Sequence, residues 1–332
     1  MENFSLNDAR DVAERLTANI KKVMVGKEEI LRLGVMALLC RGHVLIEGVP
    51  GVGKTMFARS IAVSVGGTFK RIQCTSDLLP SDITGTYIFD QRDREFHFRP
   101  GPIMANMVLV DEVNRASPRT QSAFLESMEE RQVTVDGVTH PMPEPFLLLA
   151  TRNPAEHGGT FPLPETELDR FLLRVRLTYP TADEETAIVE RQYPVHPIQN
   201  LTQVVEIEEV VLAQNALREV FLDRLVTDYA IALVNATRNN PSVHLGASPR
   251  ASLALVSLAQ AHALLEGRDF TLPDDVKAVA TAVLGHRLIL TAEGRADATE
   301  DQVIENILES IPVERGAGME RFPFPTVRHP GG

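Results

Sequence analysis

Cysteine is scarce in this sequence. The 332 residues include only two cysteines, Cys40 and Cys74, which are too few for the disulfide framework that stabilises small secreted domains. Residues 1–16 carry charged side chains spread among apolar ones, a pattern typical of neither a signal peptide nor a transit peptide. These absences favour a protein of the reducing cytoplasm.

Long hydrophobic runs are also missing. The apolar stretch 146–150 is far shorter than the roughly 18 residues that a membrane-spanning helix requires. Hydrophobic residues make up 44% of the chain and charged residues 23%, and these values are ordinary for globular proteins. We therefore expect a soluble, folded chain without membrane insertion.

Positive charge is in deficit. Lys and Arg number 33 against 45 Asp and Glu, which leaves a net charge of −12. Such a field repels nucleic-acid phosphates unless basic groups are gathered in one channel, which disfavours general nucleic-acid binding. The nine histidines show none of the Cys/His spacings of zinc sites, which disfavours a metal other than magnesium.

Strand and helix patterns alternate through the first half of the chain. Ser5 is a candidate N-cap for a first helix, and a second helix is predicted from about Lys27 to Leu39. Short apolar runs predict strands, and helical patterns lie between them. The predicted strands are 43–47, 68–73, 107–111, 145–151 and 172–177, and the helical stretches are 54–65, 117–130 and 164–171. This alternation predicts an α/β fold with a doubly wound parallel sheet.

Two segments that interrupt this alternation are predicted to be β-hairpins. The first spans residues 87–98 around a polar turn, and the second spans 132–139 around Asp136-Gly137, a favoured turn dipeptide. Neither hairpin is needed to complete the sheet.

Helical patterns dominate after residue 180. Thr181 with Glu184 and Thr299 with Gln302 have the capping-box spacing, and Ser248 precedes a proline at a predicted helix start. We predict three parts, namely an α/β core at 1–195, an all-α domain at 196–312 and an extended tail at 313–332.

A complete phosphate-binding loop lies between the first predicted strand and the next helix. It reads Gly48-x-x-x-x-Gly53-Lys54-Thr55, in the strand-to-helix context that this motif requires. Lys54 should reach the β- and γ-phosphates of a nucleotide, and the Thr55 hydroxyl should bind Mg²⁺. No lysine follows an asparagine, so the Asn-Lys-x-Asp guanine signature is missing. Adenine is the favoured base.

Polar residues follow two further predicted strands. Asp111 and Glu112 end the strand 107–111, and Asn153 follows the strand 145–151. Because parallel strands end at one edge of a sheet, these side chains should face the phosphate-binding loop. We assign Asp111 to Mg²⁺, Glu112 to the attacking water, and Asn153 to the γ-phosphate or that water.

Taken in order, these motifs resemble those of the AAA+ ATPases, and most specifically the MoxR branch. The resemblance covers roughly residues 21–311. The segments that carry it are Glu47–Thr55, Asp111–Ala116, Ala150–Pro154, Leu168–Phe171 and Gly246–Ala251.

The resemblance implies a P-loop AAA+ αβα domain followed by a helical lid, with ATP and Mg²⁺ as cofactors. It implies a ring, usually hexameric, with ATP between subunits. It also implies chaperone-like remodelling or metal-cofactor maturation of client proteins, including a protein with a von Willebrand factor A domain. The two hairpins match the helix-2 insert and the pre-sensor-1 insert of this clade.

The same resemblance assigns roles to individual residues. Asn153 corresponds to sensor 1, Arg250 to sensor 2, and Arg170 to the arginine finger, with Arg174 and Arg115 as alternatives for the finger. The residues expected to contact the nucleotide are Val25, Gly26, Gly48, Pro50, Gly51, Val52, Gly53, Lys54, Thr55 and Met56.

A DNA-translocating or helicase-associated AAA+ motor is the alternative function. Arg92, Arg94 and Arg99 lie near the first predicted hairpin, where a ring would repeat them around its pore. The net charge of −12 and the absence of a separate DNA-binding motif oppose this alternative. A small-molecule kinase fits poorly with a fused helical domain.

Overall fold

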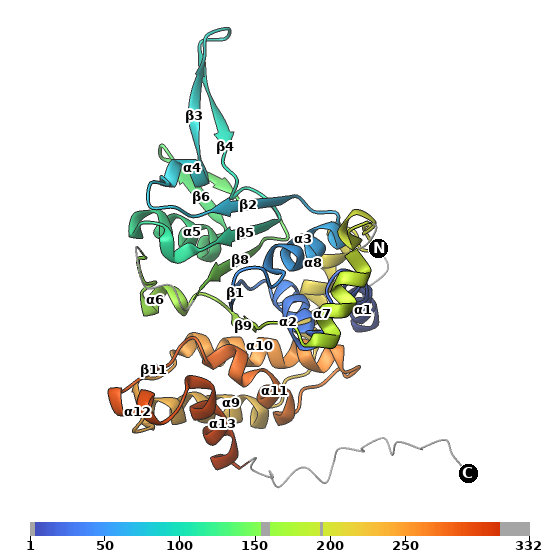
Figure 1. Cartoon of the computed structure of the whole chain (residues 1–332), viewed down its shortest axis with the longest axis vertical. Helices are drawn as coiled ribbons and strands as arrows, with labels where there is room; N and C mark the ends of the chain where they lie inside the picture. The colour runs from blue at the N-terminus through green and yellow to red at the C-terminus, as the bar shows by residue number, and fades with distance from the viewer. Residues whose placement is uncertain (1–3, 154–159, 193–194, 313–332) are drawn as a thin grey trace, which may run out of the picture.

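The computed structural model describes residues 4–153, 160–192 and 195–312. Figure 1 shows an α/β domain, a helical lid below it, and a hairpin that projects from the end of the α/β domain opposite the lid. The predicted tail at 313–332 lies outside the described residues.

A five-stranded parallel sheet forms the centre of the α/β domain, in the order β2-β5-β8-β1-β9. Its strands are β1 (Val44–Gly48), β2 (Phe69–Gln73), β5 (Met107–Asp111), β8 (Leu147–Arg152) and β9 (Leu173–Leu177). All five predicted strands and the parallel arrangement are confirmed. Since every strand runs the same way, the polar residues that follow β1, β5 and β8 reach one edge of the sheet.

Side chains alternate between the two faces of this sheet, as in any β-strand. Leu45 and Val108 belong to one buried cluster, while Val44, Leu109 and Leu149 belong to another. Helices pack on both clusters. The helices of this domain are α1 (Leu6–Lys21), α2 (Glu28–Leu39), α3 (Lys54–Val65), α4 (Pro80–Thr84), α5 (Pro118–Glu130), α6 (Glu165–Leu168), α7 (Ala182–Gln192), α8 (Ile207–Ala216) and the 3₁₀ turns η1 (Val113–Arg115), η2 (Pro197–Gln199) and η3 (Leu217–Glu219).

Most helix starts agree with the sequence. Ser5 caps α1 through a capping box with Asp8, and Lys27 stands just before α2 in a left-handed conformation. The predicted helix 164–171 was too long, since α6 ends at Leu168 and Arg170 lies in the turn that follows. The helix stops there because the residues that follow it form hydrogen bonds with the lid residue Arg287.

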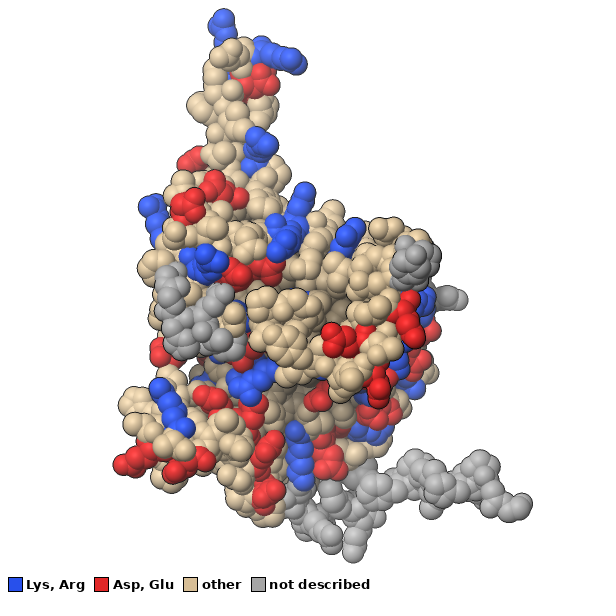
Figure 2. All heavy atoms as spheres, viewed as in Figure 1, with Lys and Arg blue, Asp and Glu red and all other residues tan. Residues whose placement is uncertain are grey.

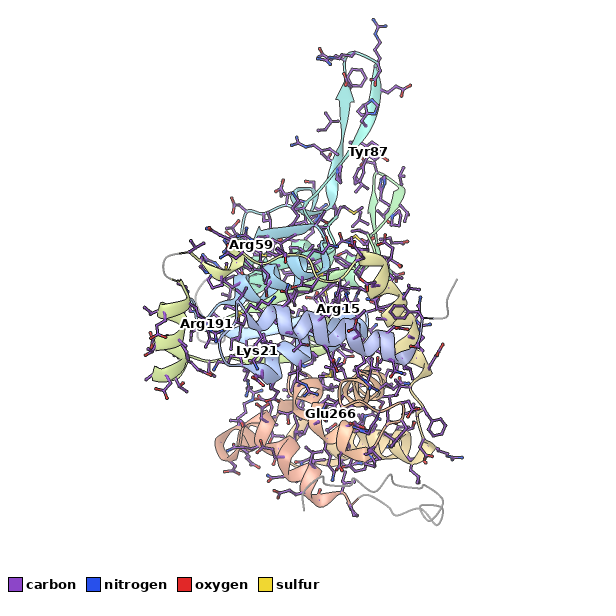
Figure 3. The ribbon with its side chains drawn as sticks, turned by 90° about the vertical axis from the view of Figure 1, so that its right-hand side faces the viewer. Arg15, Lys21, Arg59, Tyr87, Arg191 and Glu266 are labelled. Carbon is purple, nitrogen blue, oxygen red and sulfur yellow. The ribbon has the colours of Figure 1, made fainter. Side chains whose placement is uncertain are left out.

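Both predicted hairpins are present. The first pairs β3 (Gly85–Asp90) with β4 (Glu95–Pro100) and forms the projection at the top of Figure 1. The second pairs β6 (Gln132–Val135) with β7 (Val138–Pro141). Its turn uses Asp136 and Gly137, both at positive φ, the conformation that a two-residue hairpin turn requires. The hydroxyl of Tyr87 in the first hairpin, labelled in Figure 3, lies 3.3 Å from His140 Nε2 in the second, within hydrogen-bond distance.

The segment after residue 195 first returns to the α/β domain. In α8, Glu209 forms an ion pair with Arg15 of α1 at 2.6 Å, and Gln214 donates a hydrogen bond to the Leu38 carbonyl of α2. Arg15 is marked in Figure 3. The domain limits 1–195 and 196–312 remain a prediction, and this packing favours a later boundary, between Val220 and Arg224.

The lid is a helical bundle with one small β-pair. Its helices are α9 (Arg224–Asn239), α10 (Pro249–Leu265), α11 (Pro273–Leu284), α12 (Ala292–Asp297) and α13 (Glu300–Ser310). The expectation of an all-α domain missed the antiparallel strands β10 (Val243–Leu245) and β11 (Ile289–Leu290), which are too short to give a periodic sequence pattern. The predicted caps at Ser248 and Thr299 are confirmed.

None of the helices within the described ranges combines the length and the apolar character that a membrane span needs.

Candidate active site

The predicted phosphate-binding loop joins β1 to α3. Gly51 and Gly53 adopt φ values of +85° and +91°, which glycine adopts without steric cost. The Lys54 ammonium donates a hydrogen bond to the Gly48 carbonyl at 2.7 Å. Thr55 stands in the first turn of α3, and the helix N-terminus adds positive potential there. A glycine cradle, a lysine and a helix start together fit a nucleotide's phosphates.

A pocket opens beside this loop and is lined by half of the residues predicted to contact the nucleotide. Five of the predicted residues line it, and the loop between α1 and α2, helix α7 and the segments that flank α7 provide the others. The lining residues are Val23, Met24, Val25, Lys27, Gly51, Val52, Gly53, Met56, Pro180, Ile188, Arg191, Gln192, His196 and Pro197. Arg191 is marked on α7 in Figure 3. The sequence offered no signal for the contribution from residues 180–197, because no motif marks it.

The remaining loop residues have other surroundings. Gly26 has a φ of +65°, and a Cβ there would lie 2.0 Å from Glu184 Oε1. Glycine at this position therefore allows the α1–α2 loop to pass close to α7. Gly48 ends β1 and Pro50 lies exposed in the turn that follows, so neither is part of the pocket lining.

Thr151 connects the two predicted acids at the carboxyl edge of the sheet. Its hydroxyl donates to Asp111 Oδ1 at 3.1 Å and accepts from the Glu112 backbone N–H at 3.0 Å. Arg71 donates to the other oxygen of Asp111 at 2.6 Å. Neither Thr151 nor Arg71 has a sequence signal for this role beyond its position in a predicted strand. Asn153 follows β8 at the same edge.

Glu112 points away from the core. Its backbone has a φ of +57°, and its carboxylate contacts Arg115 Nη1 at 2.9 Å and Gln73 Nε2 at 3.3 Å. The side chain is 29% exposed, so water can reach it. Arg115, one alternative for the arginine finger, is thus bound to the acid of its own chain.

The oxygen donors at this edge suit a magnesium ion. Mg²⁺ prefers carboxylate, hydroxyl and water oxygens. Asp111 is 7% exposed, and hydrogen bonds from Arg71 and Thr151 orient its two carboxylate oxygens. The Thr55 hydroxyl belongs to the helix that starts at the phosphate loop. These two residues would hold the ion, which would supply charge neutralisation to bound phosphates.

Glu47 lies just before the phosphate loop at the centre of an ion-pair cluster. It is 5% exposed and meets Arg152, Arg174 at 3.6 Å and Arg176 at 3.2 Å. Burial alone would raise the pKa of Glu47, but the arginine charges outweigh it and the pKa is lowered. Arg174 and Arg176 also pair with Asp301 of the lid helix α13. Arg174, the other alternative finger, is therefore buried within its own chain.

Arg170 and Arg250 meet on one carboxylate. Arg170 contacts Glu129 Oε2 at 2.5 Å and the Leu125 carbonyl at 3.3 Å, and Arg250 pairs with Glu129 Oε1. Glu129 lies near the C-terminus of α5. The anion beside Arg250 in this structure is thus a carboxylate.

This arginine pair lies at the sheet edge opposite the phosphate loop. Leu173, three residues after Arg170, pairs with Val44 at the start of β1, and β1 then runs to Gly48. Five residues at about 3.3 Å each separate the two edges by roughly 15 Å. Neither arginine therefore lies at its own chain's phosphate loop.

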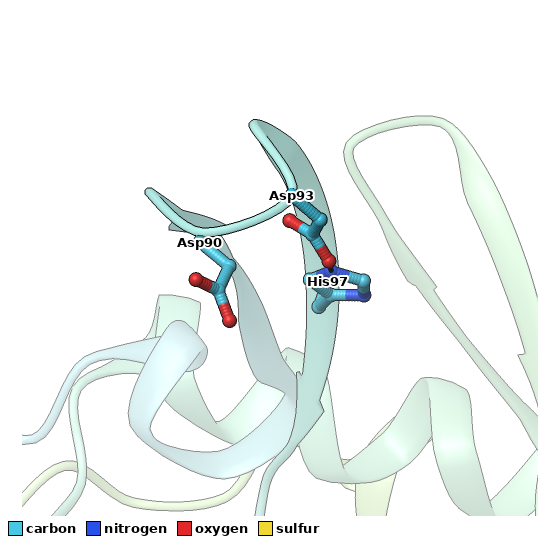
Figure 4. A group of neighbouring side chains, drawn as sticks. All are labelled: Asp90, Asp93 and His97. Carbon is cyan, nitrogen blue, oxygen red and sulfur yellow. Dashed lines mark hydrogen bonds and ion pairs between the residues drawn. The ribbon is translucent and has the colours of Figure 1, made fainter.

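Three side chains of types that can bind a metal ion, Asp90, Asp93 and His97, lie together at the tip of the projecting hairpin (Figure 4). All are exposed. Asp90 accepts a hydrogen bond from the Arg92 backbone, and Asp93 accepts one from Glu95 and pairs with His97. These hydrogen bonds form within the hairpin turn, and they explain why the three side chains lie close together.

Known proteins share this architecture. The model of the ATPase family associated with various cellular activities (AAA) matches residues 43–173, and the AAA lid domain model matches 235–307. The crystal structure of a Cytophaga hutchinsonii protein superposes with a TM-score of 0.86 at 36% identity, covering 93% of this chain and 97% of that one. Fold and motifs together define the class, an AAA+ ATPase that hydrolyses ATP.

Full-length relatives narrow the class. Chaperone MoxR1 of Mycobacterium tuberculosis is 42% identical over 90% of this chain and 81% of its own length. The uncharacterised protein YeaC of Bacillus subtilis is 47% identical over 93% and 98%. MoxR of Methylorubrum extorquens is 31% identical over 92% and 96%. The chain belongs to the MoxR family of AAA+ ATPases.

Proposed function

We propose that this ATPase depends on magnesium and assembles into a hexameric ring. The ring uses ATP hydrolysis to remodel client proteins in the cytoplasm. Its similarity to chaperone MoxR1 supports a chaperone-like role. Maturation of a metal-containing partner and cooperation with a von Willebrand factor A domain protein are part of the proposal.

The position of Arg170 is the observation that best supports assembly into a ring. Arg170 and Arg250 share Glu129 at the edge of the sheet opposite Lys54. A guanidinium that stabilises charge on the transferred phosphoryl group must contact that group. Hydrolysis therefore requires the phosphate loop of one subunit to meet the arginines of the next.

The residues at the carboxyl edge take the remaining roles. Lys54 binds the terminal phosphates, and Thr55 with Asp111 holds the metal ion. Glu112 accepts a proton from the attacking water, and Asn153 orients that water or the γ-phosphate. The contact of Glu112 with Arg115 must loosen when Glu112 acts as a base.

The projecting hairpin supports a protein client. Phe89 and Phe96 are 47% and 67% exposed, with ring centroids 5.2 Å apart. Figure 2 shows basic side chains at the tip, with acidic ones beside them. The tip segment 90–95 holds three acids and two arginines, a mixed charge that suits a polypeptide better than a DNA backbone. ATPase stimulated by DNA would instead favour the translocase.

A mixing experiment tests the ring mechanism. Arg170→Ala should bind ATP normally but lose hydrolysis by roughly 10³-fold. Glu112→Gln subunits lack the base but keep Arg170. An equal mixture should recover about a quarter of wild-type activity, because random assembly places an intact pocket against an intact finger at that fraction of interfaces.

Two results would contradict the proposal. One is full hydrolysis by Arg170→Ala, and the other is a mixture that stays inactive although native mass spectrometry shows mixed rings. The matched control is Arg224→Ala, a lid arginine whose side chain is 90% exposed and which should change nothing.

A further inference from the structure

The turn that carries Arg170 is held by the lid. Residues 169–172 join α6 to β9, and their backbone N–H groups bond to the α/β domain, for example Leu172 N–H to the His43 carbonyl at 2.9 Å. The carbonyl groups of Asp169, Phe171 and Leu172 and the Asp169 carboxylate accept hydrogen bonds from the lid instead. The finger is thus attached to two domains.

Arg287 is the centre of the lid side of this attachment. Its guanidinium donates to Asp169 Oδ1 at 2.9 Å, to the Asp169 carbonyl at 3.3 Å, to the Phe171 carbonyl at 2.6 Å and to the Leu172 carbonyl at 3.2 Å. Another bond goes to the Val283 carbonyl within the lid. A guanidinium has five N–H donors, and four of these five bonds hold the residues on both sides of Arg170.

Two neighbouring lid residues reinforce the contact. Ser248 donates to Asp169 Oδ2 at 2.6 Å, and His286 Nε2 lies 3.1 Å from the Phe171 carbonyl. Burial lowers the pKa of His286 well below its ordinary value, so the ring is neutral. Because a carbonyl only accepts, Nε2 carries the proton. Arg287 is 8% exposed and Phe171 1% exposed, so this contact excludes water.

We propose that Arg287 is a positioning residue that sets the arginine finger through Asp169 and the carbonyls of Phe171 and Leu172. The proposal rests on the finger role of Arg170. A shift of the lid moves Arg287 and, through its hydrogen bonds, the turn that carries Arg170. Arg170 is the group that completes the active site of the neighbouring subunit. Lid position in one subunit therefore controls hydrolysis in the next.

The first test is kinetic. Arg287→Gln keeps much of the side-chain volume but removes the charge and the donor fork. Its turnover should fall by roughly 10²-fold, the effect of misplacing a catalytic group by about 1 Å. Its KM for ATP should stay within about twofold, because the phosphate loop and base pocket are intact.

The second test assigns Arg287 to a complementation group. Mixed with Glu112→Gln subunits, Arg287→Gln subunits should regain activity, since their own pockets meet intact fingers. Mixed with Arg170→Ala subunits they should stay inactive, since every finger in that ring is missing or misplaced. If Arg287 served only its own subunit's pocket, the latter mixture would recover instead, because intact pockets would then meet intact fingers.

A matched control separates positioning from loss of folding. Arg268 pairs with buried Asp275 inside the lid and does not contact residues 169–172. Arg268→Gln should lower the unfolding temperature comparably yet retain hydrolysis. Equal loss of activity in both variants, or recovery in the Arg287→Gln with Arg170→Ala mixture, would overturn the proposal.

The proposed function would fail differently. Full hydrolysis by Arg170→Ala alone would show that Arg170 is not the arginine finger. Inactive Arg170→Ala that recovers with Glu112→Gln would preserve the finger, and only the behaviour of Arg287→Gln would then decide the clamp.

Discussion

The carboxyl edge of the sheet and its amino edge hold their functional side chains in different ways. At the carboxyl edge, Asp111 and Glu112 are organised by nearby residues of the same domain, Thr151 above all. At the amino edge, the Arg170 side chain pairs with Glu129, and the lid residue Arg287 bonds to Asp169 and Phe171 on either side of it. Binding groups are thus fixed within one domain, whereas the finger depends on how two domains sit together.

This comparison predicts that the two edges respond differently to substitution. Changes to Asp111 and Glu112 should alter chemistry with little effect on domain packing. Changes where the lid meets the α/β domain should alter stability, local opening, or the activity of a neighbouring subunit.

The largest effect is expected for Glu112→Gln. Loss of the general base should slow hydrolysis by roughly 10²–10⁴-fold while ATP still binds. The side chain is 29% exposed and its surface ion pair contributes little, so the free energy of unfolding should change by less than about 1 kcal/mol. Single-turnover hydrolysis and urea denaturation measure the two quantities.

The exposed glutamate of α8, Glu208, gives the control. Glu208→Gln should leave both hydrolysis and stability unchanged. A Glu112→Gln enzyme with near wild-type turnover would show that another residue is the base.

Glu47→Gln should instead lower the free energy of unfolding. It leaves Arg152, Arg174 and Arg176 around a neutral amide, and breaking a buried ion pair costs about 3–5 kcal/mol. Because the folded-state pKa of Glu47 is lowered, its contribution is present above the unfolded pKa of about 4.3. That contribution is lost as the pH falls through the folded value, so the stability gap to wild type should shrink in acid.

Urea denaturation at pH 7 and near pH 3 measures this gap. Glu28→Gln, in the exposed ion pair with Lys21, is the matched control and should leave the free energy of unfolding almost unchanged. Equal losses for the two variants would contradict the central role of the buried cluster.

The sequence predicted where Lys54, Asp111 and Asn153 lie, at the carboxyl edge, because that edge is built from contiguous segments. A strand, a glycine loop and a helix lie in one stretch of chain around Lys54, so spacing alone carries the geometry. Asp111 and Asn153 follow from strand direction. The predicted parallel sheet and both hairpins rest on equally local patterns, which explains their success.

The amino edge depends on contacts between distant parts of the chain. Arg287 lies more than a hundred residues from Asp169, and an arginine after a histidine has no local signature. The same holds for Glu129, which joins Arg170 to Arg250, and for Thr151, an ordinary strand residue by its pattern. Side chains whose role is to connect elements are visible only once the elements are packed.

The smallest expected effect concerns the two cysteines, which report on the two regions separately. Cys74 is fully buried beside the Asp111 backbone, whereas Cys40 is partly buried and its thiol contacts the Ser257 carbonyl of α10 in the lid at 3.3 Å. Burial raises the pKa of each thiol to about 12. At pH 8 the reactive thiolate is therefore rare in the folded protein, and labelling requires local opening.

Labelling with a thiol reagent should therefore be slow for both cysteines and faster for Cys40, since lid separation is a smaller opening than disruption of the sheet. Arg287→Gln loosens the lid contact and should speed the reaction of Cys40 by roughly two- to tenfold without changing that of Cys74. Single-cysteine variants, Cys40→Ala and Cys74→Ala, assign the two rates. If Arg287→Gln accelerated both cysteines equally, the substitution would have weakened the whole fold, and the separation between a rigid nucleotide edge and a lid-dependent finger edge would be wrong.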